Sequence, residues 1–466
     1  MKRVNIRISN VLSSQRMDVT YHKDYRGIYN FVPLSRYVDI KGGKRIPKGM
    51  SFSSERTNYL YLRLSDIADF ENINYDDLKC ISEDLYNKLK RYEIKKDQIV
   101  FSIAGTIGRV FLMKNIPEGK HIILTENCAM LLPKNDEVFP EFVSILLNCS
   151  FFQKQVEQNR IQTTIPKIGL ERIGKIKIPK MPGINRQQYI VDYFKKETEK
   201  RQLKYLQANI ERNSIDSVIL KSLSIILPPK KDQNCDKKFH VKVSVLFNNR
   251  IDPYYHKPYF DKAFDCLRKS HGIKYLRDIA ELITSGITPK SGGKDYTTSE
   301  KGIAFIRSGD IDISGDIDFS NLLFITPQIH NTTMKSSQLR RNDIMIAIVG
   351  ATIGQIGIYL SDKEANINQA IALVRLKEGV NPEYIKEVLK SSIGQLNLDR
   401  LKRPVARANI NLEEVGSILI PVPDIDKQEE IVRKVKDIRT KAKQLQKEGN
   451  ALLEEARKKI ESLIIG

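Results

Sequence analysis

The stretch Leu170 to Pro179, LERIGKIKIP, recurs as Leu412 to Pro421, LEEVGSILIP, with six identical residues in ten. Each copy reads as a short strand and ends at a proline that opens a Pro-rich exit. A pattern that recurs in a chain of 466 residues indicates a repeated structural unit. The sequence therefore predicts two globular units, each closed by one of these strands.

Further matches between the two halves of the chain keep the same order. RMDVTYHK, Arg16 to Lys23, matches RIDPYYHK, Arg250 to Lys257, with five identities in eight. YLRLSDI, which starts at Tyr61, matches FIRSGDI, which starts at Phe305. The matches that follow are Asp97 with Asp343, Thr106–Gly108 with Thr352–Gly354, Asn127 with Asn368, and Ala129 with Ala370. Because chance does not preserve such an order, we expect one copy of the same fold in each half.

After each Pro-rich exit the spacing of apolar residues becomes helical. Both helical segments start with a glutamine that precedes an Ile-Val pair, Gln187 in the first half and Gln428 in the second. Apolar residues then recur every seven positions, as in helices that pack along another long helix. The residues expected to pack are Leu203, Leu206, Ile210, Ile431, Val435, Ile438, Leu445 and Leu452. Each helix could pack on its own domain, but two such helices at equal positions favour packing on each other.

These patterns predict an α+β protein in which two globular mixed α/β domains in tandem repeat are combined with two long helices. We place the first domain at residues 1–185 and the central helix with its linker at 186–235. The second domain takes residues 236–424, and the C-terminal helix takes 425–466. The polar stretch PPKKDQNCDKK, which starts at Pro228, is typical of a linker.

The composition indicates a nucleic-acid partner. The chain has 77 Lys and Arg residues against 56 Asp and Glu residues, which gives a formal net charge of +21. Such a basic surface favours a polyanion, because each cation placed against a phosphate releases counterions. The uncharged stretch Ile344 to Leu360 is interpreted as a buried strand, turn and strand instead of a membrane span, and we find no signal-peptide pattern. We expect a cytoplasmic protein with no membrane partner.

Signatures of catalysis and of metal binding are missing. GlyGlyLys at Gly292 is followed by Asp295 and does not complete a nucleotide-binding loop. The string that starts at Asp252 lacks the second proline of an amino-methyltransferase loop, and Asp424 is better explained as a helix cap. The five cysteines show no CxxC spacing, and the six histidines show no metal-ligand spacing. We therefore predict no catalytic residue, metal site or cofactor on this chain.

The ordered set of motifs resembles one family, the specificity subunits of Type I restriction and modification enzymes. Each half carries the Leu-Glu-x-x-Gly segment with an Ile-Pro end and the helix that follows. The second half adds SGITP at Ser285 to Pro289, FIRSGDI, and AsnGlnAla at Asn368 to Ala370. The first half departs from the pattern at Arg45 to Pro47, and at Asn127 and Cys128.

This resemblance implies that each domain is a target recognition domain that reads one half of a bipartite DNA sequence. It implies that the two helices form an antiparallel coiled-coil spacer, which sets the gap between the halves. Two methyltransferase subunits and the restriction or translocase subunits would dock on this chain. Those partners would use S-adenosylmethionine, ATP and Mg²⁺, whereas this chain would carry out no reaction.

Candidate DNA-binding residues are basic or amide side chains just before the closing segments, together with cations beside matching prolines and strands. They are Lys48, Arg63, Arg160, Gln162, Thr163, Lys167, Lys290, Arg307, Arg400, Lys402, Arg403, Arg407 and Asn409. Solvated loops are an equal alternative for the two loops, and ion pairs with Asp66 and Asp310 are an equal alternative for the two strand-end arginines. The ThrIleGly turns are interpreted as structural.

Two other functions stay open from the sequence. The chain could be an enzyme that acts on nucleic acid through an unrecognised site, in which case the purified chain alone would modify or cut DNA. It could also be a non-enzymatic coiled-coil scaffold that binds nucleic acid without sequence preference.

Overall fold

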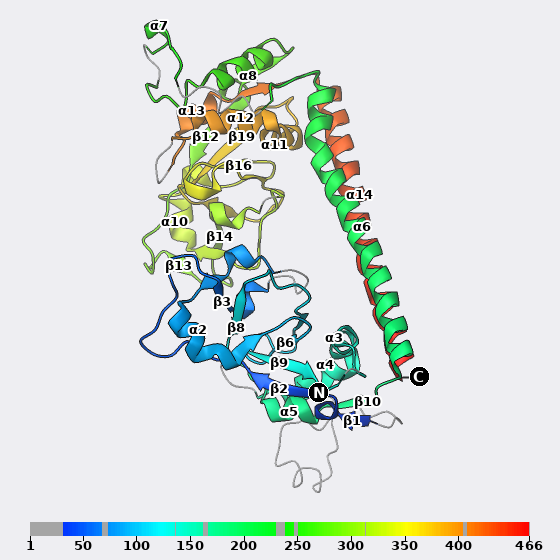
Figure 1. The fold of residues 1–466 in the computed structure, drawn as a ribbon. Helices are drawn as coiled ribbons and strands as arrows, with labels where there is room; N and C mark the ends of the chain where they lie inside the picture. Colours follow the sequence, from blue (N-terminus) through cyan, green and yellow to red (C-terminus); the bar gives the residue numbers. More distant parts are fainter. Residues whose placement is uncertain are drawn as a thin grey trace. The chain divides into compact units, whose positions relative to one another are not determined.

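The computed structural model describes residues 31–67, 73–135, 137–161, 166–229, 238–246, 250–312, 314–403 and 408–465. The chain divides into two units, residues 1–204 with 447–466, and residues 205–446. Each unit combines one mixed α/β domain with parts of two long helices (Figure 1). The segment matched at Arg16 to Lys23 lies outside the described residues.

Domain 1 contains two four-stranded sheets and a two-stranded ribbon. The first sheet has the order β2 (Val38–Gly42), β9 (Cys128–Pro133), β6 (Ile99–Ser102), β7 (Val110–Leu112). The second has the order β4 (Lys79–Cys80), β3 (Tyr59–Leu62), β8 (His121–Leu124), β5 (Glu93–Ile94), with β3 and β8 parallel. The ribbon pairs β1 (Phe31–Pro33) with β10 (Lys177–Pro179). The helices are α2 (Glu83–Leu89), α3 (Pro140–Leu147), α4 (Ser150–Asn159) and α5 (Leu170–Lys175).

Domain 2 repeats the first sheet and the ribbon, whereas the fourth strand of its second sheet lies at the other edge. One sheet has the order β12 (Ala280–Ser285), β19 (Ile371–Leu376), β16 (Ile344–Ala347), β17 (Ile356–Ile358). The other has the order β13 (Tyr296–Thr297), β15 (Leu323–Ile325), β14 (Ile303–Ile306), β18 (Ala365–Ile367), with β14 and β18 parallel. The ribbon pairs β11 (Ile273–Tyr275) with β20 (Leu419–Pro421). The helices are α8 (Pro258–Arg268), α9 (Leu276–Ile279), α10 (Pro327–Asn331), α11 (Pro382–Lys390), α12 (Ser392–Leu401) and α13 (Leu412–Gly416); outside this plan, the short α7 (Val243–Leu246) precedes α8.

Of two local predictions, the one for the uncharged stretch is confirmed and the one for the closing segment is wrong. The uncharged stretch from Ile344 forms the buried antiparallel strands β16 and β17, so the strand–turn–strand interpretation is confirmed, and no described helix has the length and apolar character of a membrane span. The repeated closing segment is not one strand, because its first half is helical in both copies. In the second copy Asn411 and Glu414 form a reciprocal capping box that starts this helix.

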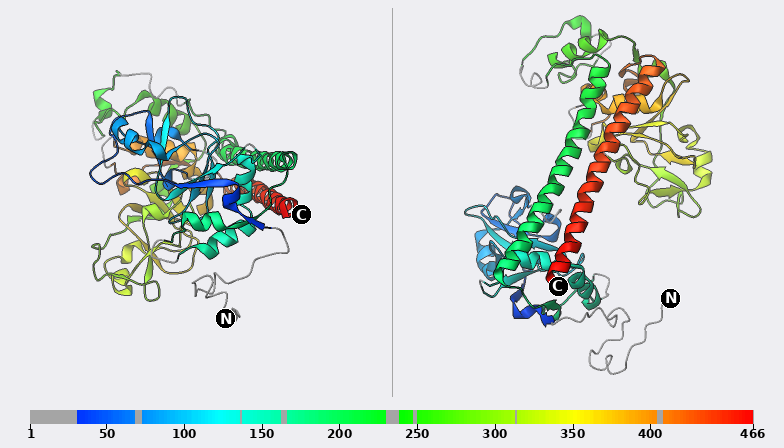
Figure 2. Two further views of the ribbon diagram at one scale, coloured as in Figure 1. Left: turned by 60° about the horizontal axis from the view of Figure 1, so that its bottom comes forward. Right: turned by 90° about the vertical axis from the view of Figure 1, so that its right-hand side faces the viewer.

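The two long helices are α6 (Ile184–Ser222) and α14 (Ile425–Ile465), with 39 and 41 residues. In the first unit the start of α6 lies beside the end of α14, where Arg186 donates to the carbonyl of Leu463 at 2.7 Å. In the second unit the end of α6 lies beside the start of α14, where Lys441 pairs with Glu211 at 2.6 Å. The helices are therefore antiparallel (Figure 2), and the predicted fold class is confirmed.

The predicted packing face of α6 is wrong. Leu203, Leu206 and Ile210 are exposed by 58%, 56% and 59%. The buried residues on α6 are instead Gln187, Ile190, Glu197, Ala208 and Ile219. On α14, Ile431 and Val435 are buried, whereas Ile438, Leu445 and Leu452 are only partly buried and Ala442 and Ala456 are fully buried. Ion pairs such as Lys204–Glu448 and Lys441–Glu211 join the two helices, whereas Leu203, Leu206 and Ile210 did not mark the buried face of α6.

A buried glutamine fixes each domain to the helix that follows it. The Gln187 side chain is fully buried, accepts from the amide of Phe139 at 3.0 Å, and donates to the carbonyls of Glu137 and Pro182, both at 2.8 Å. Gln428 repeats this arrangement, because it accepts from the amide of Asn381 at 3.0 Å and donates to the carbonyl of Pro423 at 2.8 Å.

Each domain also contacts the long helix of the other repeat through a carboxylate. Ser150, the first residue of α4, donates its hydroxyl to Glu461 of α14 at 2.8 Å and also its backbone amide. Ser392, the first residue of α12, donates its amide to Asp216 of α6 at 2.6 Å. A carboxylate at a helix N-terminus satisfies free amides and complements the helix dipole. Both domains therefore hold one helix of each repeat.

We predict that Gln187→Ala destabilises the protein by about 2–4 kcal/mol, because buried backbone groups lose their partners. Chemical denaturation followed by circular dichroism measures this loss. Gln188→Ala is the matched control, since Gln188 is exposed and bonds only Asp192 on the helix surface. Equal stability of the two variants would contradict the role assigned to Gln187.

Candidate nucleic-acid interface

Five segments of domain 1 gather around the connection between β8 and β9. These junction segments are residues 43–48, 62–66, 103–108, 124–127 and 161–167, of which 162–165 lie outside the described residues. Backbone hydrogen bonds join them, from Lys44 to Leu124 (2.9 Å), Thr125 to Leu62 (3.1 Å), Ile103 to Asn127 (2.8 Å) and Gly105 to Pro166 (3.1 Å). Four of the segments contain predicted DNA-binding residues or the ThrIleGly turn, and the structure brings them together.

Domain 2 has the same junction segments, at residues 286–290, 306–310, 348–354, 367–370 and 408–410. The corresponding backbone bonds run from Asn368 to Ile306 (3.1 Å), Ile348 to Ala370 (2.9 Å) and Gly350 to Ala408 (2.9 Å). Both domains therefore present one common arrangement of loops, built on equivalent strand ends.

These bonds correct three matches made from the sequence. Thr125 and Asn368 donate to equivalent strand carbonyls, so Thr125 and Glu126 correspond to Asn368 and Gln369. The pairings of Asn127 with Asn368 and of Ala129 with Ala370 were therefore both wrong by two positions. Asp97 and Asn342 both have positive φ, at 64° and 74°, and both amides donate at 2.7 Å to the carbonyl of the residue that follows a strand, Met113 after β7 or Tyr359 after β17. Asp97 thus corresponds to Asn342 and not to Asp343.

A glycine at the start of each first junction segment is required by close packing. A Cβ on Gly286 would lie 1.7 Å from the carbonyl oxygen of Ile367, and a Cβ on Gly43 would lie 2.0 Å from that of Thr125. Gly286 of the SerGlyIleThrPro motif therefore corresponds to Gly43 in domain 1. The sequence placed the reduced counterpart of this motif at Arg45 to Pro47 and did not include the glycine, because the flanking residues differ.

The two strand-end arginines form the ion pairs that the sequence left as an alternative. Arg63 donates from Nε and Nη2 to Asp66 at 3.0 and 2.6 Å, and Arg307 donates likewise to Asp310 at 3.1 and 2.9 Å. The hydrogen bond to the neighbouring aspartate raises the pKa of each guanidinium above its usual value. The arginine side chains are still 37% and 41% exposed, so one edge of each guanidinium faces outward.

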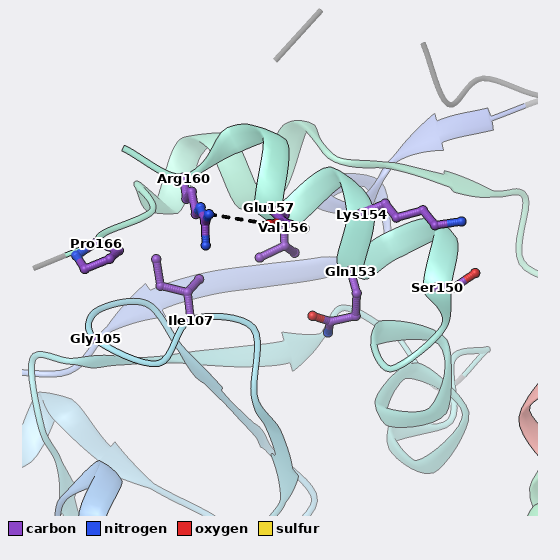
Figure 3. Close-up of a pocket in the computed structure, with 9 residues that line it drawn as sticks. All are labelled: Gly105, Ile107, Ser150, Gln153, Lys154, Val156, Glu157, Arg160 and Pro166. Atoms are coloured by element: carbon purple, nitrogen blue, oxygen red, sulfur yellow. Dashed lines mark ion pairs between the residues drawn. The ribbon is translucent and has the colours of Figure 1, made fainter. Parts of the chain in front are cut away.

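A hollow of about 360 Å³ lies in domain 1 between α4, the ThrIleGly turn and Pro166 (Figure 3). Arg160 and Glu157 form an ion pair at 3.4 Å on its rim, while Ile107 projects from the turn below them. Lys154 also lines this hollow. The predicted residue Arg160 therefore lies beside the junction segments, whereas Gln162, Thr163 and Arg407 lie outside the described residues.

The remaining candidates fall into two groups. Lys48, Lys167, Lys290 and Asn409 are exposed on or at the end of junction segments. Arg403 is held by Glu414 at 2.8 Å, and Lys402 lies 4.0 Å from Asp399. The structure does not bring Arg400 to the junction segments, because its guanidinium is 12% exposed and is stacked between Tyr255 and Phe264, at 4.3 and 4.7 Å from the ring centroids.

Sequence reasoning missed an acidic side chain at the centre of the domain 1 junction. Glu126 accepts from Nε of Arg45 at 2.6 Å and from the hydroxyl of Thr125 at 3.1 Å. Burial alone would raise the pKa of Glu126, but the hydrogen bonds from Arg45, its own backbone and Thr125 hold the pKa below its usual value. No signal in the sequence joined Arg45 to Glu126, because the two residues are far apart in the chain.

No group of three or more His, Cys, Asp or Glu side chains that could hold a metal ion occurs among the residues that the structure describes. The junction segments expose basic, amide and hydroxyl groups instead. Such groups bind phosphate oxygens and base edges.

Comparison with known proteins agrees with the repeat. Residues 29–212 and residues 272–455 each match the family model described as "Type I restriction modification DNA specificity domain". The chain belongs to this family.

Individual relatives are more distant. The chain is 35% identical over 153 residues to the Type I restriction enzyme EcoBI specificity subunit of Escherichia coli, which is 33% of this chain and 32% of the relative. The match thus spans about a third of that relative's length.

Two solved structures are similar along most of their length. The Type I restriction-modification S subunit from M. genitalium is 16% identical, with 95% and 98% of the two chains covered and a TM-score of 0.39. The HsdS subunit from Thermoanaerobacter tengcongensis is 14% identical, with 94% and 96% covered and a TM-score of 0.38.

The specificity-domain family model ends inside a long helix in both matches, at residue 212 in α6 and residue 455 in α14. One family unit therefore consists of a globular domain and most of the helix that follows it. The two matches have the same length, and their positions relative to Gln187 and Gln428 agree to within two residues, as expected for a tandem repeat.

We predict that Asp310→Asn destabilises this specificity-domain protein by about 1.5–3 kcal/mol, because Asp310 is buried and its charge accepts two hydrogen bonds from Arg307. Urea denaturation checks the value. Asp265→Asn provides the comparison, since the Asp265–Arg268 pair is more than half exposed and should contribute at most about 0.5 kcal/mol. If Asp310→Asn lowers the free energy of unfolding no more than Asp265→Asn does, the Arg307–Asp310 pair does not stabilise the fold.

Proposed function

We propose that this chain is the DNA sequence-specificity subunit of a Type I restriction–modification complex, and that each domain reads one half of a bipartite DNA target. The observation that carries the proposal is the pair of junctions, which have one backbone arrangement but different side chains. Domain 1 has Thr125 and Glu126 where domain 2 has Asn368 and Gln369. A shared scaffold with different polar groups suits the recognition of two different half-sites.

Recognition would follow the rules of base-edge hydrogen bonding. Arginine, lysine, asparagine and glutamine side chains of the junction segments would contact base edges, with about 1–3 kcal/mol of discrimination for each good bidentate pair. Exposed cations such as Lys48 and Lys290 would add contacts to phosphates, which are sensitive to salt and independent of sequence. The net charge of +21 supports this second contribution.

The antiparallel helices would set the gap between the half-sites. Each domain contacts one helix through its buried glutamine and the other through a carboxylate, so its orientation on the helix pair is defined within its own unit. Two methyltransferase subunits would dock on this chain, together with restriction or translocase subunits. Those partners would supply S-adenosylmethionine, ATP and Mg²⁺ chemistry, and the chain itself would be non-catalytic.

The first test maps methylated adenines after co-expression of the chain with its methyltransferase. We expect a single bipartite motif with a fixed gap. Exchange of residues 31–182 for those of a relative should then alter one half of the motif only. Methylation at unrelated sequences would favour the non-specific scaffold, and cleavage or methylation of DNA by the purified chain alone would favour an enzyme.

The second test lengthens the helix pair. One heptad is inserted after Lys204 in α6 and one after Gln446 in α14, so that the facing positions keep their register. Seven helical residues add about 10.5 Å, which equals about three base pairs of DNA. The gap in the methylated motif should widen by about this amount, while both half-sites stay unchanged.

Insertion into α6 alone serves as the control for this experiment. It breaks the register of pairs such as Lys204–Glu448, which lie 2.7 Å apart, and should abolish methylation instead of widening the gap. If the double insertion leaves the gap in the methylated motif unchanged, the helices do not set the distance between the half-sites.

A further inference from the structure

One arginine of the domain 1 junction is exposed and yet oriented by the protein. The Arg45 side chain is 79% exposed, and its Nε donates to Oε1 of Glu126 at 2.6 Å. Its pKa is raised by this hydrogen bond, so the guanidinium is a permanent cation. Among the described residues, no hydrogen bond uses the two terminal nitrogens of Arg45. These nitrogens are therefore free to meet a ligand.

Glu126 is itself held in place from the other side. Its Oε2 accepts from the hydroxyl of Thr125 at 3.1 Å. The hydroxyl of Tyr61, a buried residue of β3, donates its single proton to the carbonyl of Lys44 at 2.8 Å and lies 3.4 Å from Oε2 of Glu126. The carboxylate is thus held by Thr125 and Arg45, next to a core residue.

The Arg45–Glu126 ion pair orients the Arg45 side chain more than it stabilises the folded protein. An ion pair with a mostly exposed partner contributes little to the free energy of unfolding. Anchoring of Nε removes rotamer freedom from Arg45 before any ligand binds, which reduces the entropy lost on binding. The remaining edge of the guanidinium presents two parallel N–H donors, the geometry that matches two neighbouring acceptors.

Guanine offers such acceptors. Its N7 and O6 atoms both accept hydrogen bonds in the major groove, and arginine is their most common bidentate partner. The equivalent of Glu126 in domain 2 is Gln369, an exposed amide that both donates and accepts. Adenine, which presents one acceptor and one donor, matches an amide better. The two junctions thus differ in the base that they suit.

We propose that Arg45, positioned by Glu126, reads a guanine in the half-site that domain 1 recognises. The inference rests on the proposed function and names a base-reading residue and its positioning residue. Glu126 acts through Arg45 and makes no base contact of its own.

The test uses the full chain co-expressed with its methyltransferase, with Arg45→Ala, Arg45→Lys and Glu126→Gln as variants. Arg45→Ala should relax one position of the motif, in one half-site, from guanine to any base. It should also lower affinity for the cognate duplex about 5- to 150-fold, as expected for one bidentate contact. Arg45→Lys keeps the charge but should not restore the preference, because lysine lacks the fork.

Glu126→Gln should relax the same position while Arg45 is present. A purely structural role would change the unfolding midpoint without changing the motif, so the methylation map separates the two roles. Lys96→Ala is the control, since Lys96 is an exposed cation of domain 1 that lies outside the junction segments. It should leave both the motif and the preference for the cognate duplex unchanged.

Two results would overturn the inference while the proposed function stands. If Arg45→Ala weakens all sequences equally and lowers the salt dependence by about one phosphate contact, Arg45 binds the backbone. If the variant changes neither motif nor affinity, the pair is a surface ion pair only. A wild-type chain that directs no bipartite methylation would instead refute the proposed function, and the inference with it.

Discussion

A buried glutamine side chain at the start of each long helix is the constraint on which the architecture depends. Gln187 and Gln428 bond backbone groups of the preceding domain and of the Pro-rich exit, so the domain and the helix cannot rotate independently. Leaving these backbone groups unpaired in the interior would cost more than the bonds themselves contribute. The long helices thereby become extensions of the domains instead of flexible connections.

The two domains show how one scaffold supports different surfaces. Backbone bonds of the junction segments are equivalent in both, and they require glycine at Gly43 and Gly286. The side chains that these bonds leave outside the core differ, with an Arg45–Glu126 pair in one domain and Gln369 in the other. The backbone arrangement of the junction segments is thus common to both domains, and their exposed side chains can differ without changing the fold.

Sequence patterns predicted the repeat, the long helices and the buried hairpin at Ile344, because these features depend on local apolar spacing and on Pro and Gly positions. They predicted the wrong face of α6, since ion pairs join the two helices while Leu203, Leu206 and Ile210 are exposed. They paired Asn127 with the wrong residue because equivalent positions in the two domains are defined by backbone hydrogen bonds. These bonds put Thr125 and Glu126 at the positions that Asn368 and Gln369 occupy in the other domain, whatever the side chains. The Arg45–Glu126 pair depends on a long-range contact that no spacing reveals.

The ribbons that close each domain determine how easily one domain can be exchanged for another. β1 pairs with β10, and β11 pairs with β20, so the first described strand and the closing strand of each domain are neighbours. A segment with adjacent ends can be replaced by a foreign one of the same type without disturbing the rest of the polypeptide. Exchange of one such segment would therefore replace one domain and leave the other domain and both long helices unchanged.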